Sequence, residues 1–312
     1  MEIMVTGAAG FIGRNLIPTL SNHCKKIYAV DNLNPLLYSS KIKNINFKYL
    51  STLKNVKCIE LDTNEITRNA DYKNLDLIVN LAALPGQSLS WENTNEYIKN
   101  NISNVNNLIR EFCINGESFF LQASTSSVYG KVAIGGSSQI LKPNNPYGVT
   151  KLAAENLIDA YSQNYDFDFS IMRLFSVYGP HQRPDMGISK FITSIMNGSQ
   201  VTIYGDGTQS RSLTYVTDVV NAIIKLIEIK PSKQTIDISG NKVVSVNEIV
   251  SICENVVGKK ALVQFVPTPI GDQEKTIGDI EKAEKILGIT EYTSIEHGIK
   301  EQFKELNGVL VS

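Results

Sequence analysis

A glycine-rich segment near the N-terminus constrains the fold of this 312-residue chain more than any other feature. Gly7, Gly10 and Gly13 follow an apolar run at residues 3–5, in the spacing G-x-x-G-x-x-G, and a helical pattern begins at Phe11. Such a loop lets the backbone approach a phosphate group, and the free N–H groups at the start of the helix point toward it. The pattern predicts a βαβ unit that binds a dinucleotide.

The identity of the dinucleotide is indicated by Asp31, which ends a second apolar run at residues 26–30. An acid at this position accepts hydrogen bonds from the hydroxyls of an adenosine ribose and repels a 2′-phosphate. Asn32 follows and no arginine stands alongside, so the sequence favours NAD over NADP as the cofactor. The competing interpretation is that Asp31 is a solvated acid at the end of a strand.

The rest of the first half alternates strand-like apolar runs with helical segments, which is typical of repeated βαβ units. Strands are predicted at residues 2–5, 26–30, 56–61, 75–81, 118–123 and 169–174, and helices at residues 12–21, 92–113, 146–165, 188–197, 219–228, 246–257 and 280–287. The predicted fold class is α/β, a doubly wound parallel sheet of the Rossmann type with a smaller C-terminal α/β domain.

The domain boundaries are predicted from the same pattern. Residues 1–175 would form the NAD-binding domain, together with a segment near residues 205–240 that returns to it. Residues 176–312 would form most of a substrate-binding domain that packs over the first as a lid. The cleft between the two would hold the substrate.

Composition excludes several classes of protein. With 42% apolar and 20% charged residues and a formal net charge of −1, the chain lacks the basic surface expected of a nucleic-acid-binding protein. Its four cysteines are widely spaced and it has three histidines, which argues against a disulfide framework and a metal site. No stretch of about 18 apolar residues and no signal-peptide pattern occurs. We therefore expect a cytoplasmic protein without a metal, membrane or nucleic-acid partner.

A second informative motif lies midway along the chain, where Tyr147 and Lys151 are four residues apart and would share one face of a helix. Asn145 is a suitable N-cap, and Pro146 suits the first helical turn. A lysine ammonium and the positive nicotinamide of an oxidised cofactor would lower the pKa of Tyr147 and make it a general base. The alternative is a pair of surface side chains, but the hydroxyl-rich segment 123–130 ends a predicted strand at the ligand-binding edge of the sheet.

The joint pattern resembles the extended short-chain dehydrogenase/reductase superfamily, in its branch of nucleotide-sugar epimerases and dehydratases. The matching segments run in order along essentially the whole chain: GAAGFIG, VDNL, NLAA, ASTSSVYG, NPYGVTK, RLFSVYGP, YGDGTQSR and TYVTDVV. The resemblance implies tightly bound NAD and a nucleoside-diphosphate sugar as substrate. The cofactor contacts that it implies are Gly7, Gly10, Phe11, Ile12, Gly13, Asp31, Asn32, Asp62, Thr63, Leu81, Ala82, Ala83, Asn101, Tyr147 and Lys151.

The resemblance also implies a division of catalytic labour. Tyr147 would remove a proton from a sugar hydroxyl while the nicotinamide takes the hydride. Lys151 would contact the ribose and lower the pKa of the phenol, and Thr125 would hydrogen-bond the reacting oxygen. A homodimer is also implied, formed through the helices predicted at residues 92–113 and 146–165.

The two residues after Thr125 distinguish the branches of this family. Related 4,6-dehydratases carry an Asp-Glu pair there, because elimination of water needs an acid and a base, whereas this chain has Ser126 and Ser127. Serine hydroxyls do not supply either function at neutral pH. The sequence therefore favours epimerisation at C4, in which hydride leaves C4 and returns through a 4-keto intermediate.

The choice of sugar is indicated by the segment RLFSVYGPHQRPDMG, which is most similar to UDP-glucuronate 4-epimerases. By that resemblance the residues around the sugar carboxylate would be Ser126, Ser127, Ser176 and Arg183. The resemblance also implies that Arg211 and Asp272 bind the diphosphate end of the substrate. Two departures bear on binding: Ser88 stands where many glucuronate relatives carry Arg, and Pro269 replaces a second common Arg.

Three other functions stay open at this point. The first is a 4-epimerase acting on UDP-glucose or UDP-N-acetylglucosamine, in which the same serines would meet a neutral C6 hydroxyl or an N-acetyl sugar. The second is a 4,6-dehydratase with unusual acids. The third is a non-catalytic NAD-binding regulatory protein.

Overall fold

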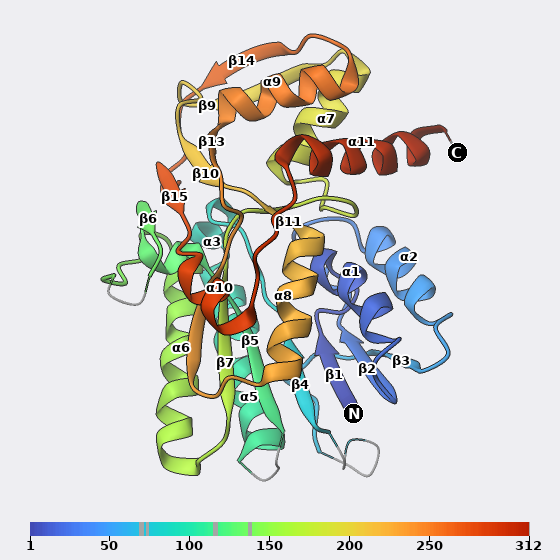
Figure 1. Cartoon of the computed structure of the whole chain (residues 1–312), viewed down its shortest axis with the longest axis vertical. Helices are drawn as coiled ribbons and strands as arrows, with labels where there is room; N and C mark the ends of the chain where they lie inside the picture. The colour runs from blue at the N-terminus through green and yellow to red at the C-terminus, as the bar shows by residue number, and fades with distance from the viewer. Residues whose placement is uncertain (69–71, 73–74, 115–117, 137–138, 312) are drawn as a thin grey trace.

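The computed structural model describes residues 1–68, 72, 75–114, 118–136 and 139–311, and its centre is a seven-stranded parallel sheet (Figure 1). The strand order is β12-β7-β5-β4-β1-β2-β3, so the order reverses between β1 and β4, where doubly wound sheets bind ligands. The predicted Rossmann-type α/β fold is therefore confirmed. The strands are β1 Glu2–Thr6, β2 Lys26–Asp31, β3 Val56–Glu60, β4 Leu77–Asn80, β5 Phe119–Thr125, β7 Phe169–Leu174 and β12 Gln234–Ile238.

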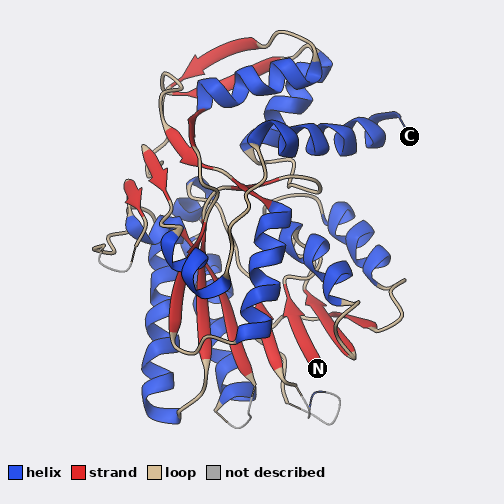
Figure 2. Cartoon of the chain, viewed as in Figure 1, coloured by secondary structure: helices blue, strands red, loops and turns tan. Residues whose placement is uncertain are grey.

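Helices cover both faces of this sheet (Figure 2). Ile3 and Val5 of β1 belong to the same apolar cluster as residues of α1 (Phe11–Leu20) and α8 (Val216–Ile229). Met4, which points to the opposite face, packs in a cluster with residues of α5 (Asn104–Leu108) and α6 (Pro146–Tyr165). Burial on both faces explains why the strands are apolar throughout rather than alternating.

The second half of the chain contributes to two regions. Strand β12 pairs with β7 at the edge of the large sheet, and α8 and α10 (Glu281–Leu287) pack beside it. The remaining elements form a smaller region at the top of Figure 1. They are β8 Val177–Tyr178, α7 Gly187–Asn197, β9 Gln200–Tyr204, β10 Ser210–Ser212, β11 Thr214–Tyr215, β13 Val243–Ser245, α9 Val246–Val257, β14 Leu262–Val266, β15 Lys275–Ile277 and α11 Ile295–Val311. Strand β6 (Val132–Ile134) pairs with β15.

Three helical features differ from the prediction. The single helix predicted at residues 92–113 is a series of short segments: α3 (Ser88–Glu92), α4 (Thr94–Ile98), α5, and π-helical turns at Lys99–Ser103 and Ile109–Cys113. Helix α2 (Ser40–Leu50) escaped prediction because it has almost no apolar stripe, and only Asn46 and Leu50 are buried. The terminal helix α11 was also not predicted. No helix in the described ranges is long and apolar enough to cross a membrane.

Candidate active site

A cavity of about 360 Å³ opens at the carboxyl ends of β1, β2, β4 and β5. Met186 and Gln273, from the second half of the chain, complete its wall, so the cavity lies between the large sheet and the smaller region. The predicted site residues that line it are Gly7, Gly10, Phe11, Ile12, Gly13, Asp31, Asn32, Thr63, Leu81, Ala82, Ala83, Thr125, Ser126, Ser127, Tyr147, Lys151, Ser176 and Arg183.

The glycine loop has no room for side chains at two of its three glycines. A Cβ on Gly7 would lie 2.8 Å from the backbone nitrogen of Ala82, and one on Gly13 would lie 2.6 Å from the carbonyl oxygen of Ala8. Gly7 also has a φ of +66°, which side-chain-bearing residues rarely adopt. Helix α1 begins after Gly10 with no side-chain cap, so its first N–H groups are left for a ligand in the cavity.

Asp31, the acid predicted to bind the ribose, lies at the end of β2, as predicted from the sequence. One carboxylate oxygen of Asp31 accepts a hydrogen bond from the Leu33 amide at 2.8 Å, and the other accepts one from the Ala9 amide at 3.1 Å. Burial raises the pKa of Asp31, and the ammonium of Lys43, 3.9 Å away, opposes this shift. Lys43 and Tyr38 also line the cavity, and neither belongs to a motif from which the sequence could have identified it.

A further wall residue, Asn104 of α5, has an unsatisfied acceptor. Its side-chain nitrogen donates to the carbonyl oxygens of Ala82 and Asn100, whereas its buried Oδ1 has no hydrogen-bond partner in the described chain. This acceptor, the uncapped start of α1 and the carboxylate of Asp31 fit the phosphates and hydroxyls of a dinucleotide. No group of three or more His, Cys, Asp or Glu side chains among the described residues is arranged to hold a metal ion.

Tyr147 and Lys151 lie on the first turns of α6, and its predicted cap is confirmed. The Asn145 side chain accepts a hydrogen bond from the Gly148 amide at 2.8 Å, and Pro146 opens the helix. The Tyr147 ring packs edge-on against the buried ring of Tyr97, with 6.2 Å between centroids. This packing and the cap fix where the phenol projects into the cavity.

Burial has the largest effect on the pKa values of both Tyr147 and Lys151. Burial raises the pKa of Tyr147, while a hydrogen bond with Thr125 and the charge of Arg183 act in the lowering direction. Lys151 donates to the carbonyl oxygen of Ala123 at 2.6 Å. Burial also lowers the pKa of Lys151 to about 8, against the raising effect of Glu155.

A buried polar network that was not predicted from the sequence holds α6. Glu155, one turn after Lys151, forms an ion pair with Arg173 of β7 at 2.6 Å. Arg173 donates to the hydroxyl of Tyr129 at 2.9 Å, and that hydroxyl donates to Asp237 of β12 at 2.8 Å. The network connects α6 to two strands of the sheet, β7 and β12.

Four predicted residues lie outside the lining of this cavity. Asp62 accepts from the Asn64 amide and pairs with Lys99, and buried Asn101 holds the Leu84 amide at 2.8 Å. The remaining two, Arg211 and Asp272, pair with each other at 3.3 Å.

A second cavity of about 780 Å³ lies beside the first. Asp272 and Pro269 line it, and Gln273 lines both cavities, so the two are adjacent. Ser88, noted in the sequence as a departure near the sugar, is exposed and outside both linings, whereas its neighbour Gln87 lines the first cavity.

Comparison with known proteins places the chain in one family. The model of the NAD dependent epimerase/dehydratase family matches residues 3–239. A Bacillus subtilis protein named as the uncharacterized UDP-glucose epimerase YtcB is 36% identical over 99% of both chains. A UDP-glucuronate 4-epimerase of Thermodesulfobacterium geofontis is 35% identical over 95% of this chain and 93% of its own.

The solved structures agree with the sequence relatives. The UDP-glucuronic acid 4-epimerase of Bacillus cereus, in complex with UDP-glucuronic acid and NAD, superposes with a TM-score of 0.94. The two chains are 32% identical, and the match covers 99% of this chain and 100% of the other. With the dinucleotide-binding features of the cavity, these similarities establish that the chain is an NAD-dependent enzyme and belongs to the epimerase/dehydratase family.

Proposed function

We propose that this enzyme is a nucleotide-sugar 4-epimerase and that its substrate is UDP-glucuronate, in equilibrium with UDP-galacturonate. The observation that carries the proposal is the combination of Thr125, Tyr147 and Lys151 in one cavity with Ser126 and Ser127. The first three residues supply proton transfer. The two serines supply hydrogen bonds and no acid or base.

The proposed chemistry divides between the protein and its cofactor. Tyr147, as phenolate, accepts the proton of the C4 hydroxyl while the C4–H bond breaks and a 4-keto sugar forms. NAD, held by the glycine loop and Asp31, would accept the C4 hydride and return it to the other face of the keto sugar. Thr125 hydrogen-bonds the reacting oxygen, and the ammonium of Lys151 favours the phenolate once both groups face the ribose.

The carboxylate of the sugar is assigned to the wall formed by Ser126, Ser127, Ser176 and Arg183. All four residues line the cavity, and Arg183 carries the positive charge. The Arg183 guanidinium is held by two hydrogen bonds to Asp185, at 2.7 Å and 3.0 Å, which use two of its five N–H donors. The other three are available to an anion. A fixed carboxylate also limits loss of CO₂, to which a β-keto acid is prone.

The nucleotide is assigned to the second cavity, which adjoins the first at Gln273. Arg211 lies at this end and offers a planar fork suited to a diphosphate. It now donates to the carbonyl oxygen of Gln273 at 2.5 Å and to Asp272 at 3.3 Å. Binding of a diphosphate would draw the guanidinium away from Asp272.

A neutral UDP-hexose is the second candidate substrate, because the relative that is 36% identical is named as a UDP-glucose epimerase. Dehydration is less well supported, since Ser126 and Ser127 provide neither acid nor base. A purely regulatory NAD-binding protein would not need proton-transfer residues, so this role does not explain why Thr125, Tyr147 and Lys151 occur together.

The test of the proposed substrate is proton NMR of the purified enzyme with NAD and UDP-glucuronate. We expect a second anomeric signal, that of UDP-galacturonate, to grow to equilibrium. If the enzyme epimerises only UDP-glucose or UDP-N-acetylglucosamine, its substrate is a neutral sugar and not UDP-glucuronate. Accumulation of a stable 4-keto product would contradict the assignment of Ser126 and Ser127.

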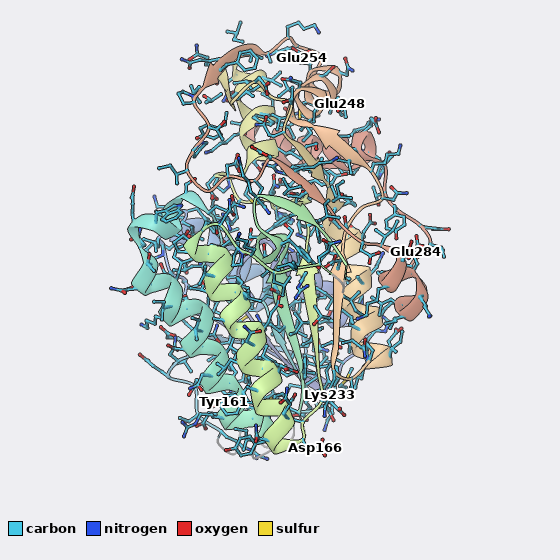
Figure 3. The ribbon with its side chains drawn as sticks, turned by 90° about the vertical axis from the view of Figure 1, so that its left-hand side faces the viewer. Tyr161, Asp166, Lys233, Glu248, Glu254 and Glu284 are labelled. Atoms are coloured by element: carbon cyan, nitrogen blue, oxygen red, sulfur yellow. The ribbon has the colours of Figure 1, made fainter. Side chains whose placement is uncertain are left out.

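We also propose that the enzyme is a homodimer formed through α6 and the helical segment α4–α5. These elements lie side by side on one face, where Tyr161 is visible on α6 (Figure 3), and the Tyr161 hydroxyl donates to Asn106 at 2.8 Å. Ile98 of α4 is 43% exposed, and Val149 of α6 is 51% exposed. A second copy placed here would bury them.

The dimer is tested by analytical ultracentrifugation at micromolar concentration. We expect sedimentation of the wild-type protein to give a molecular mass twice that of one chain. Ile98→Asp should shift the population to monomer, because it buries a charge at the interface. A wild-type protein that is monomeric throughout would refute this interface.

A further inference from the structure

Two glutamine side chains connect the proposed carboxylate wall to the smaller region. Gln87 precedes α3 and lines the first cavity, and Gln273, only 5% exposed, lies where the two cavities meet. Nε2 of Gln87 is 3.0 Å from Oε1 of Gln273 and 3.2 Å from Oγ of Ser127. The three side chains therefore form one continuous hydrogen-bonded chain.

Backbone carbonyl groups fix the orientation of both amides. Nε2 of Gln273 donates to the carbonyl oxygens of Gly130 at 2.8 Å and Ser126 at 3.4 Å. A carbonyl oxygen only accepts, so the NH₂ group of Gln273 must face these two atoms and its oxygen must face Gln87. The oxygen of Gln273 in turn requires the NH₂ group of Gln87 to face it. One hydrogen of Gln87 then remains for Ser127.

This orientation makes the Ser127 hydroxyl a donor toward the substrate. Its oxygen accepts from Gln87, so its own hydrogen is left to point to another acceptor. Ser127 is 2% exposed and lines the cavity. A hydroxyl oriented to donate suits a carboxylate, which only accepts hydrogen bonds, better than a hydroxymethyl group.

We infer that Gln87 and Gln273 are specificity-determining positioning residues, which orient the Ser127 hydroxyl to donate to the C6 carboxylate of the sugar. The inference rests on the proposed function for the placement of the sugar. It adds the reason why this serine selects an anionic C6 group. The two glutamines are neutral, so their contribution to selection comes from the direction of the hydrogen bonds that they make.

The inference is tested by the affinity for UDP-glucuronate relative to UDP-glucose, measured calorimetrically in a Tyr147→Phe background so that neither ligand is converted. Gln87→Met keeps the length of the side chain and removes its amide. We expect it to reduce the preference for UDP-glucuronate about tenfold, as loss of an oriented hydrogen bond to a charged group does. Gln273→Met should act in the same direction, and Gln87→Glu, which replaces the donor with an anion, should act more strongly.

Controls separate orientation from folding. Gln163→Met, on the exposed end of α6, should leave the preference unchanged. The affinity for UDP should be the same in the Gln163, Gln87 and Ser127 variants, because none of these residues lines the second cavity. Ser127→Ala should itself reduce the preference, and adding Gln87→Met to it should cause no further loss, because the two residues act in series. Multiplied losses in the double variant would overturn the inference.

The remaining outcomes distinguish this inference from the proposed function. An enzyme that epimerises UDP-glucuronate but keeps its preference in Gln87→Met would retain the proposed function and refute the inference. A parent protein that prefers UDP-glucose also refutes the inference. A preference that Gln87→Met abolishes, in an enzyme that does not epimerise UDP-glucuronate, would support the role of the glutamines and refute the proposed function alone.

Discussion

Tyr147→Phe is expected to lower kcat for epimerisation by about 10²–10⁴-fold, the usual contribution of a general acid–base group. The substitution removes the one hydroxyl on the first turns of α6 that can accept the proton of the sugar. The phenyl ring keeps its edge-on contact with Tyr97, so the shape of the cavity is preserved. The measurement is the initial rate of formation of the second anomeric signal, at saturating UDP-glucuronate.

Tyr147→Phe should change the binding of substrate and cofactor little, since Tyr147 stabilises the transition state more than the bound substrate. The affinity for UDP-glucuronate and the NAD content should stay within about twofold of the wild type. Tyr165→Phe, at the exposed end of the same helix, serves as a control and should leave kcat unchanged. Full activity in Tyr147→Phe would remove this residue from the proposed chemistry.

Gly7→Ala should have the second large effect, loss of NAD and of stability together. A Cβ at this position would lie 2.8–2.9 Å from backbone atoms of Leu81 and Ala82, which cannot rotate out of the way. We expect the free energy of unfolding to fall by about 3 kcal/mol or more, the combined cost of overpacking and of a positive φ. The NAD that copurifies with the protein should fall at least about tenfold, by absorbance after denaturation, because the loop backbone must move.

Gly288→Ala is a closely matched control for this substitution. Gly288 has the same φ of +66°, but a Cβ there would meet nothing within 4 Å. It should therefore show the backbone penalty alone, about 1 kcal/mol, with full NAD content. Equal losses in the two variants would mean that contact with the end of β4 is unimportant and that the positive φ explains both.

The parts of the fold that could be predicted are those set by local pattern. The apolar strands of the first half and the loop of Gly7, Gly10 and Gly13 depend on short stretches of sequence, and the structure has them at the expected places. The cap at Asn145 could also be predicted, because the N-terminus of a helix is determined by a few adjacent residues. These features position the cofactor cavity.

The parts that could not be predicted depend on contacts between distant segments. Gln87 and Gln273 are 186 positions apart, and only the folded chain brings their amides to 3.0 Å. The buried pair of Glu155 and Arg173 escaped for the same reason, since a charged residue in a sequence carries no sign of burial. The raised pKa of Tyr147 likewise reflects burial, which the spacing of Tyr147 and Lys151 does not reveal.

The central claim, that hydride leaves C4 and returns to the same carbon, is tested most directly with UDP-glucuronate deuterated at C4. The reaction would be followed by NMR in ordinary water with the wild-type enzyme. We predict that UDP-galacturonate forms with its deuterium still at C4, because a hydride carried on carbon does not exchange with solvent before it returns. Product that carries protium at C4, or deuterium at another carbon, would contradict the account.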